Sequence, residues 1–318
     1  MELEQVNILP QPAMSDQTPP TIDPIAARRW LARLPHAAPW LHEEVARRMA
    51  ERLDIIRLPV QRWADWEPSR GGRQGHALVA AHYPDAECYE VTAQHRSASG
   101  APKKIANHWW NVFGRGRESA PQVVAAPPEG QMQLVWANML AHQVSHPAQL
   151  LADWHRALAV DGFVLFSCLG PDTLRELRPL YAEQGWPPPA HEFTDMHDWG
   201  DQLVAAGFAE PVMDMELITL TFETPERLMQ ELRELGRNLH LDRFAGLRTR
   251  AWRAQLAEAM DTGLRRGGAS TPLSITFEIV YGHALKAPPR LAVAPRTEIS
   301  EAQMRASLRQ SKKNFPPH

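Results

Sequence analysis

The sequence predicts an α/β fold: a doubly wound, mostly parallel sheet with a late antiparallel hairpin. Short apolar runs typical of buried strands alternate with helical patterns in the first part of the chain. Two long extended segments follow near its end. Since strands alternate with helices through the first part of the chain, the helices are expected to cover both faces of the sheet.

The elements are predicted from hydrophobic spacing and turn residues. Leu41, Val45, Met49, Leu53 and Ile56 recur at helical spacing and predict an amphipathic helix that ends before Pro59. Asp161 and Gly162 predict a turn before the third early strand. Further helices are predicted at 150–158, 199–206, 226–235 and 252–264, and strands at 87–91, 134–137, 163–167, 212–222 and 274–285.

Composition bounds the class of protein. The 318 residues include 34 Lys plus Arg and 37 Asp plus Glu, a net charge of −3, which excludes charge-driven binding to nucleic acid or membrane as a whole-chain property. The two cysteines, Cys88 and Cys168, cannot build a disulfide framework or a cysteine-based zinc site. Residues 1–23 lack the basic start of a signal peptide, and no run of apolar residues is long enough to span a membrane. These features predict a cytoplasmic protein.

The two ends of the chain differ from its middle. Residues 1–23 are acidic, proline-rich and aperiodic, which predicts a disordered leader. Residues 288–318 contain Pro288, Pro289, Pro295, Pro316 and Pro317 among scattered basic residues, which predicts a disordered tail. The folded part is therefore predicted at 24–287.

Several stretches carry a family resemblance. They are residues 166–177 (FSCLGPDTLREL), 195–203 (DMHDWGDQL) with 206–212 (AGFAEPV), 277–286 (FEIVYGHALK), 134–138 (LVWAN) and 40–45 (WLHEEV). Together they resemble the malonyl-ACP O-methyltransferases of biotin synthesis, which are class I S-adenosylmethionine (SAM) methyltransferases. The resemblance spans about 25–286, so 24–287 is predicted to be a methyltransferase-like domain. It implies a Rossmann-like, seven-stranded, mostly parallel sheet with SAM at the carboxyl ends of the strands. It also implies a substrate carried on acyl carrier protein and methylated on a free carboxylate.

The implied cofactor site departs from the family pattern Asp-x-Gly-x-Gly-x-Gly. Asp65 matches the acidic position and Gly71 matches the last glycine. Glu67 and Ser69 replace the first two glycines, with Pro68 between them. Glycine is needed in this turn because the backbone must approach the cofactor closely. Glu67 is expected to bring bulk and negative charge close to the amino-acid end of SAM.

The other implied contacts follow from the strands and a helix end. The position that normally holds the ribose carboxylate is Thr92, and Glu90 would serve there only after a local shift. Asn138 is expected at the edge of the cofactor. Arg237, just after Gly236 at a helix end, is the candidate to grip a substrate carboxylate with its planar fork; the alternative is compensation of the helix dipole.

Three functions stay open. The first is a SAM-dependent carboxyl methyltransferase with an impaired cofactor site and no catalytic residue, because the substrate carboxylate is already ionised at neutral pH. The second is a non-enzymatic relative that binds an acidic protein through residues 95–117, which carry five basic residues, no acidic ones, and Trp109 and Trp110. Nucleic acid is the less favoured partner for this segment. The third hypothesis is a methyltransferase of the same fold that acts on another acid or on nucleic acid.

Other chemistries are less favoured. His142 and His146 have the spacing of one helix face, but Pro147 follows at once, so no metal site is predicted. Cys168 has no neighbouring histidine, and no Gly-x-Ser-x-Gly motif is present, so no nucleophilic triad is predicted. Trp63 and Trp66 flank the altered turn and are expected to fill space near the cofactor.

Overall fold

The computed structural model describes residues 21–33, 37–92, 121–265, 267–268, 270–288 and 300–305. The chain divides into two compact units, Met1–Ala287 and Pro288–His318, and the fold below belongs to the first. The basic segment 95–117, on which the non-enzymatic hypothesis depends, lies outside the described residues. Residues 1–20 of the predicted leader and most of the predicted tail also lie outside them.

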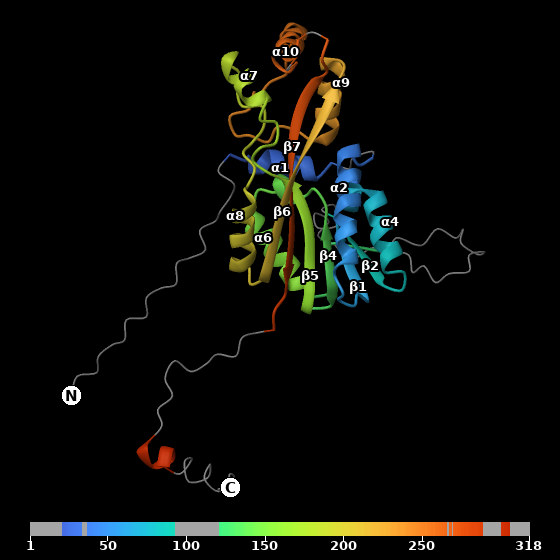
Figure 1. Cartoon of the computed structure of the whole chain (residues 1–318), viewed down its shortest axis with the longest axis vertical. Helices are drawn as coiled ribbons and strands as arrows, with labels where there is room; N and C mark the ends of the chain where they lie inside the picture. The colour runs from blue at the N-terminus through green and yellow to red at the C-terminus, as the bar shows by residue number, and fades with distance from the viewer. Residues whose placement is uncertain are drawn as a thin grey trace, which may run out of the picture. The chain divides into compact units, whose positions relative to one another are not determined.

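A seven-stranded sheet with the order β3-β2-β1-β4-β5-β7-β6 forms the centre of the fold (Figure 1). The parallel strands are β1 (Arg62–Trp66), β2 (Glu87–Val91), β3 (Gln122–Val124), β4 (Met132–Ala137) and β5 (Leu158–Leu169). The antiparallel strands are β6 (Ala209–Phe222) and β7 (Leu273–Leu285). The predicted seven-stranded, mostly parallel sheet is therefore confirmed. The strand order changes direction between β1 and β4, where doubly wound sheets bind their ligands.

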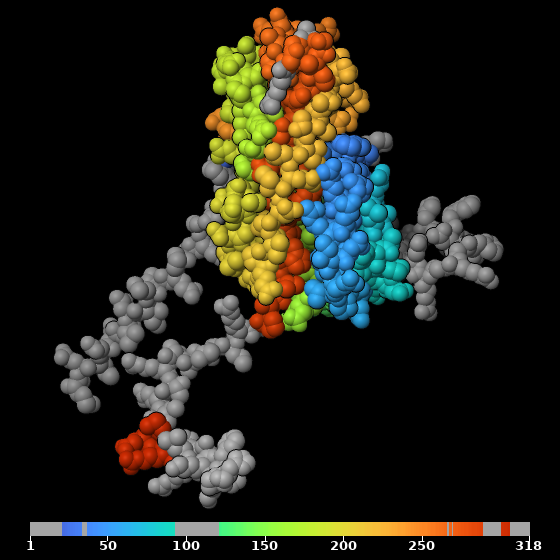
Figure 2. Space-filling model, viewed as in Figure 1, coloured from blue at the N-terminus to red at the C-terminus, as the bar shows by residue number. Residues whose placement is uncertain are grey.

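Helices cover both faces of the sheet, as predicted. On one face α2 (Trp40–Glu51), followed by η1 (Arg52–Asp54), packs Leu41, Val45 and Met49 into a core with Trp63. Helix α2 lies beside α4 (Arg73–His82), as Figure 2 shows. On the other face α6 (Pro147–Ala157) and α8 (Met196–Ala205) build a second core. The apolar stripe of each helix faces the sheet because burial of that stripe stabilises the fold.

Trp63 and Trp66 do not lie in the altered turn. They are three residues apart on β1, so their side chains point to opposite faces of the sheet. Trp63 is 1 % exposed in the core under α2, and Trp66 is 2 % exposed and meets Trp154 of α6 edge to face at 6.4 Å. The expectation that these rings fill the cofactor site is wrong, because each is buried in a core.

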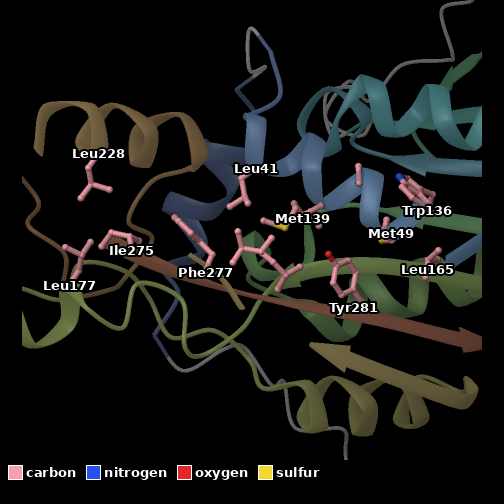
Figure 3. Close-up of a cluster of buried hydrophobic side chains, with 14 of the residues drawn as sticks. Leu41, Met49, Trp136, Met139, Leu165, Leu177, Leu228, Ile275, Phe277 and Tyr281 are labelled. Carbon is pink, nitrogen blue, oxygen red and sulfur yellow. The ribbon is translucent and has the colours of Figure 1, made fainter. Parts of the chain in front are cut away.

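A long ribbon carries the fold beyond the sheet. β7 pairs with β5 only from Leu285 to Ile279, whereas its pairing with β6 continues to Leu273. Around this extension pack α7 (Leu177–Glu183), α9 (Pro225–Leu235) and α10 (Arg250–Gly263), called here the cap helices (Figure 1). One hydrophobic core runs from Trp136 and Leu165 in the sheet to Leu228 of α9 and Ile275 in the extension of β7 (Figure 3). The cap helices are thereby fixed beyond the carboxyl end of β5.

Some predicted boundaries need correction. β5 begins at Leu158, and the predicted turn at Asp161 and Gly162 is a bulge within it, with Asp161 at φ 64°. The predicted leader is too long, because Ile22 is buried and the Asp23 N–H donates to the Leu239 carbonyl at 2.8 Å. Asp23 also caps α1 (Pro24–Leu31), which periodicity did not predict. Within the described residues no helix has the length and apolar character needed to cross a membrane.

Candidate active site

The turn after β1 keeps a left-handed backbone where the family has glycine. Glu67 has φ 58° and ψ 51°, then α3 (Pro68–Gly71) follows, and Gly72 at φ 120° leads into α4. A side chain in the left-handed region costs about 1–2 kcal/mol. The Glu67 side chain is almost fully buried. A charged residue therefore has the left-handed backbone at the position where the resemblance implies the first glycine.

Protein groups occupy the space beside both glycines. A Cβ at Gly71 would lie 3.1 Å from the Asn138 carbonyl oxygen, and one at Gly72 would lie 2.4 Å from Glu43 Oε2. Glu43 Oε1 and Oε2 accept hydrogen bonds from the N–H groups of Arg73, Gln74 and Gly75 at 2.9, 3.0 and 3.3 Å. A carboxylate at this position satisfies the free N–H groups of α4 and its positive dipole end. Glu43 therefore holds the helix terminus that follows the turn.

Two carboxylates lie side by side at the ends of β1 and β2. Asp65 is paired in register with Glu90, and both are buried. His76 Nδ1 lies 2.7 Å from Asp65 Oδ2, and Arg73 Nη1 donates to Glu90 Oε1 at 2.5 Å. Burial raises the pKa of Asp65, and the His76 contact opposes that rise. Thr92 follows the end of β2, so the carboxylate at this strand end is Glu90.

Asn138 joins four elements at the end of β4. Its Nδ2 donates to the carbonyl of His42 in α2 at 2.8 Å and to the carbonyl of Gly71 in α3. Its Oδ1 accepts the Ser167 hydroxyl of β5 at 2.6 Å. The structure brings Asn138 to Gly71, but the amide atoms of its side chain all serve buried protein partners.

A cavity of about 520 Å³ lies between the carboxyl edge of the sheet and the cap helices. At the sheet edge His142, Gln143 and Leu169 line it. Its walls are mostly apolar, so we call it the apolar chamber. The apolar lining residues are Leu174, Leu177, Met229, Leu232, Leu235, Leu256, Met260 and Phe277. Its charged lining residues are Arg233, Arg237, Arg248, Arg250 and Arg253, and no Asp or Glu of the described chain is among them.

A second cavity of about 430 Å³ adjoins the chamber, and we call it the arginine vestibule. The two share Trp30, Tyr181, Arg237, Arg248 and Trp252 among their lining residues. The charged lining residues of the vestibule are Arg29, Arg33, Arg237, Arg243 and Arg248, again without a carboxylate from the described residues. Both cavities are thus lined by arginines, and they adjoin along a shared wall.

Arg237 lies on that shared wall. Its Nη1 donates to the carbonyls of Arg233 and Gly236, the latter at 2.7 Å, and its guanidinium lies 5.3 Å over the Trp30 ring. The carbonyl contacts at the end of α9 are those expected from the helix-end alternative, and the side chain still faces both cavities. Burial, Arg33 and Arg233 lower the pKa of Arg237, so its neighbours add positive charge.

Known proteins resemble the chain over most of its length, although no protein-family model matches it. It is 37 % identical over 276 residues to the malonyl-[acyl-carrier protein] O-methyltransferase of Laribacter hongkongensis, covering 83 % of this chain and 87 % of that protein. It is 38 % identical over 260 residues to the Gallionella capsiferriformans protein of the same name, covering 79 % and 86 %. The chain belongs to the malonyl-ACP O-methyltransferase family.

Solved structures similar to this family member are more distant in sequence. The YcgJ protein from Bacillus subtilis is 13 % identical, with a TM-score of 0.46 over 76 % of this chain and 98 % of that one. Phosphoethanolamine N-methyltransferase 2 from Haemonchus contortus, solved with S-adenosyl-L-methionine, is 14 % identical, with a TM-score of 0.39 over 82 % and 56 %. The strand order itself identifies the Rossmann-like class I methyltransferase fold.

The residues of this family member fit SAM at one end of the expected site. The Glu90 carboxylate, at the end of β2, has the oxygen acceptors that ribose hydroxyls require, although its Oε1 already accepts from Arg73. At the other end Glu43 takes the N–H groups of α4, and Glu67 adds a second carboxylate. These acceptors would suit the ribose of the adenosyl part, and the turn departs from the glycine pattern where the amino-acid part of SAM would lie.

Several residues of this site were not predicted from the family pattern. Glu43, Arg73 and the arginines other than Arg237 were missed. The one signal for Glu43 was its place in residues 40–45, a stretch that carries the family resemblance. Among the residues that the structure describes, no group of three or more His, Cys, Asp or Glu side chains could hold a metal ion.

Buried histidines support the edge of the sheet. His42 Nδ1 donates to the Arg70 carbonyl at 2.7 Å, and His191 Nε2 donates to the His142 carbonyl at 2.8 Å. The Leu169 N–H donates to His142 Nδ1 at 3.3 Å. Burial lowers the pKa of His42 to about 4 and lowers the pKa of His142 and His191 as well. These rings are therefore neutral supports of the fold at pH 7.

His42 predicts a loss of stability in mild acid. Its pKa is about 4 in the folded state, below its ordinary value of 6.5, so only the unfolded state takes up the proton as the pH falls between these values. The free energy of unfolding is expected to fall by about 2 kcal/mol between pH 7 and pH 5 from this group. Urea unfolding should show a smaller fall for His42→Asn, which keeps a donor for Arg70. His82→Gln, at an exposed histidine, is the control. An unchanged slope in His42→Asn would contradict the assignment.

Proposed function

We propose that this chain is a SAM-dependent O-methyltransferase that esterifies the free carboxylate of a malonyl thioester on acyl carrier protein, a reaction of biotin synthesis. Family membership supports the reaction class. The observation that carries the proposal is the apolar chamber at the carboxyl edge of the sheet. Arginines are its charged lining residues, and no Asp or Glu of the described residues lines it. Such a cavity attracts an anionic acyl group and excludes water from it.

The residues of the chain would act by binding and orientation. Arg237 would hold the substrate carboxylate with its planar fork, whose remaining N–H groups are suited to two oxygens. The carboxylate is ionised at neutral pH, so no side chain needs to remove a proton. SAM supplies an electrophilic methyl group when bound, and Glu90 would hold its ribose. The chamber walls would orient the carboxylate and keep water away.

The cofactor site forms the second part of the proposal. We infer that Glu43 and Glu67 weaken the binding of the amino-acid part of SAM, because Glu43 already accepts the N–H groups of α4 and Glu67 adds a negative charge in the turn after β1. These residues also favour the second candidate, a non-enzymatic protein that binds an acidic carrier without SAM. A cytoplasmic location, which the two free and buried cysteines suit, and a methyltransferase-like domain at 24–287 belong to the proposal as well.

The proposal predicts methyl transfer that improves when the first glycine of the turn is restored. The full chain, SAM and malonyl-loaded carrier protein are incubated, and the methyl ester is measured by mass spectrometry. Glu67→Gly should raise the affinity for SAM, measured by calorimetry, about tenfold, because it removes a charge close to the cofactor. Glu210→Gly is the matched control, since Glu210 also has a positive φ, of 51°, but lies exposed in β6.

The outcomes separate the two candidates. Methyl ester from the wild-type chain supports the enzyme. If neither the wild type nor Glu67→Gly binds millimolar SAM or forms the ester, the enzymatic function is wrong. Capture of malonyl-loaded carrier protein by that inactive chain would then support the non-enzymatic function.

A further inference from the structure

The arginine vestibule carries positive charge that the proposed reaction does not use. Arg29 and Arg33 line the vestibule and not the apolar chamber, and both side chains are exposed. Arg243 is neutralised by Asp23 at 2.7 Å. Within the described part of the chain, no carboxylate forms an ion pair with Arg29, Arg33 or Arg248. A cavity with this lining is suited to an anion from outside the fold.

The wall of the vestibule is held in place before any ligand arrives. Trp30 Nε1 donates to Gln143 Oε1 at 2.7 Å, which fixes the ring of α1 to the sheet edge. The buried guanidinium of Arg70 donates to the Trp30 carbonyl at 2.6 Å and lies 4.8 Å from the Trp30 ring. Arg248 packs at 3.8 Å over Phe244 and at 4.2 Å over Trp252. Fixed aromatic faces of this kind position guanidinium groups and reduce the entropy lost on binding.

The shared wall connects this charge to the acyl site. Trp30, Arg237 and Trp252 line both the vestibule and the apolar chamber. A long ligand can therefore place its acyl end in the chamber and a second group in the vestibule. A thioester with one free carboxylate uses Arg237 in the proposed reaction, which leaves Arg29 and Arg33 for a second anion.

We propose that Arg29 and Arg33 form a phosphate-binding subsite, which takes the phosphate on the arm by which carrier proteins and coenzyme A hold acyl thioesters. The inference rests on the proposed function, because it takes the acyl end of the same ligand to lie in the apolar chamber. Arginine suits this task because its fork binds two phosphate oxygens at once. The subsite selects thioesters whose arm ends in a phosphate over those that lack it.

The test compares two unreactive probes, pantetheine and pantetheine 4′-phosphate, by calorimetry on the full chain. The wild type should bind the phosphate-bearing probe about 30-fold more tightly. Arg29→Gln/Arg33→Gln should lose this preference and keep the affinity for pantetheine. Arg57→Gln/Arg227→Gln removes the same charge from two exposed arginines outside both cavities and should keep the preference. Added salt should reduce the preference of the wild type, a readout that needs no variant.

Each outcome decides the proposal. Equal affinity of the wild type for the two probes overturns it, even if methyl transfer is normal. A preference without any methyl transfer supports the subsite and contradicts the proposed function instead. With malonyl-carrier and malonyl-coenzyme A as substrates, the double variant should lose kcat/KM on both, because both arms bear phosphate. A loss on the carrier alone would show that the arginines bind the protein surface of the carrier, which overturns the phosphate assignment.

Discussion

Replacement of Arg237 by glutamine is expected to lower kcat/KM for the malonyl-loaded carrier by about 30-fold. Arg237 lies on the wall common to both cavities, and its only hydrogen bonds in the described structure go to the carbonyls of Arg233 and Gly236. Arg237 is exposed, and its hydrogen bonds to an ionised carboxylate would contribute about 1.5–3 kcal/mol, which the glutamine side chain would lose. The measurement is the steady-state rate of ester formation at several substrate concentrations.

Two further variants separate substrate binding from support of α9. Arg237→Lys keeps the charge and a donor for the helix end but loses the planar fork, so it should retain an intermediate kcat/KM. Arg227→Gln, on the exposed side of the same helix, should leave kcat/KM unchanged. If Arg237→Gln only lowers the thermal stability and keeps kcat/KM, its role is that of a helix cap and the substrate assignment is wrong.

The fold could be predicted because its signals are local and repeated. The stripe of Leu41, Val45 and Met49 and the alternation of Ile275, Phe277 and Ile279 each follow one structural period, and these residues are buried as expected. β3 has three residues, too few to show a period. α1 has no apolar stripe of that length, and it is defined by its Asp23 cap and by contacts with Leu239.

The site could be predicted only where it follows the chain. Asp65, Glu67 and Gly71 are neighbours in sequence, so the departure from the glycine pattern was visible, and the left-handed φ of Glu67 agrees with it. The two cavities combine α1 with segments more than two hundred residues later, and no local pattern reports such a meeting. Glu43 of α2 accepts the N–H groups at the start of α4, thirty residues later, and no local pattern reports this contact either. The two cavities and the Glu43 contact therefore depend on long-range packing, which periodicity in the sequence does not predict.

Asn138→Ala is expected to lower the free energy of unfolding by about 3 kcal/mol. The substitution removes the Nδ2 donor of the His42 carbonyl, at 2.8 Å, and of the Gly71 carbonyl. It also removes the Oδ1 acceptor of the Ser167 hydroxyl, at 2.6 Å. Each buried polar group left unpaired costs about 1–3 kcal/mol, and only partial relaxation is expected in so tightly packed a place. Urea unfolding measures the loss.

Asn138→Asp tests which atoms matter. It keeps an oxygen for the Ser167 hydroxyl but places the other carboxylate oxygen against the carbonyls of His42 and Gly71, so it should destabilise the fold at least as much as alanine. Asn238→Ala removes a more exposed amide, which donates to the Pro188 carbonyl at 2.6 Å and accepts the His240 N–H at 2.8 Å, and it should cost about 1 kcal/mol or less. If Asn138→Ala lowers the free energy of unfolding by less than Asn238→Ala does, the Asn138 side chain does not stabilise the contacts between α2, α3, β4 and β5. Its side-chain amide would then be available to the cofactor, which is the role that the family pattern implies for this position.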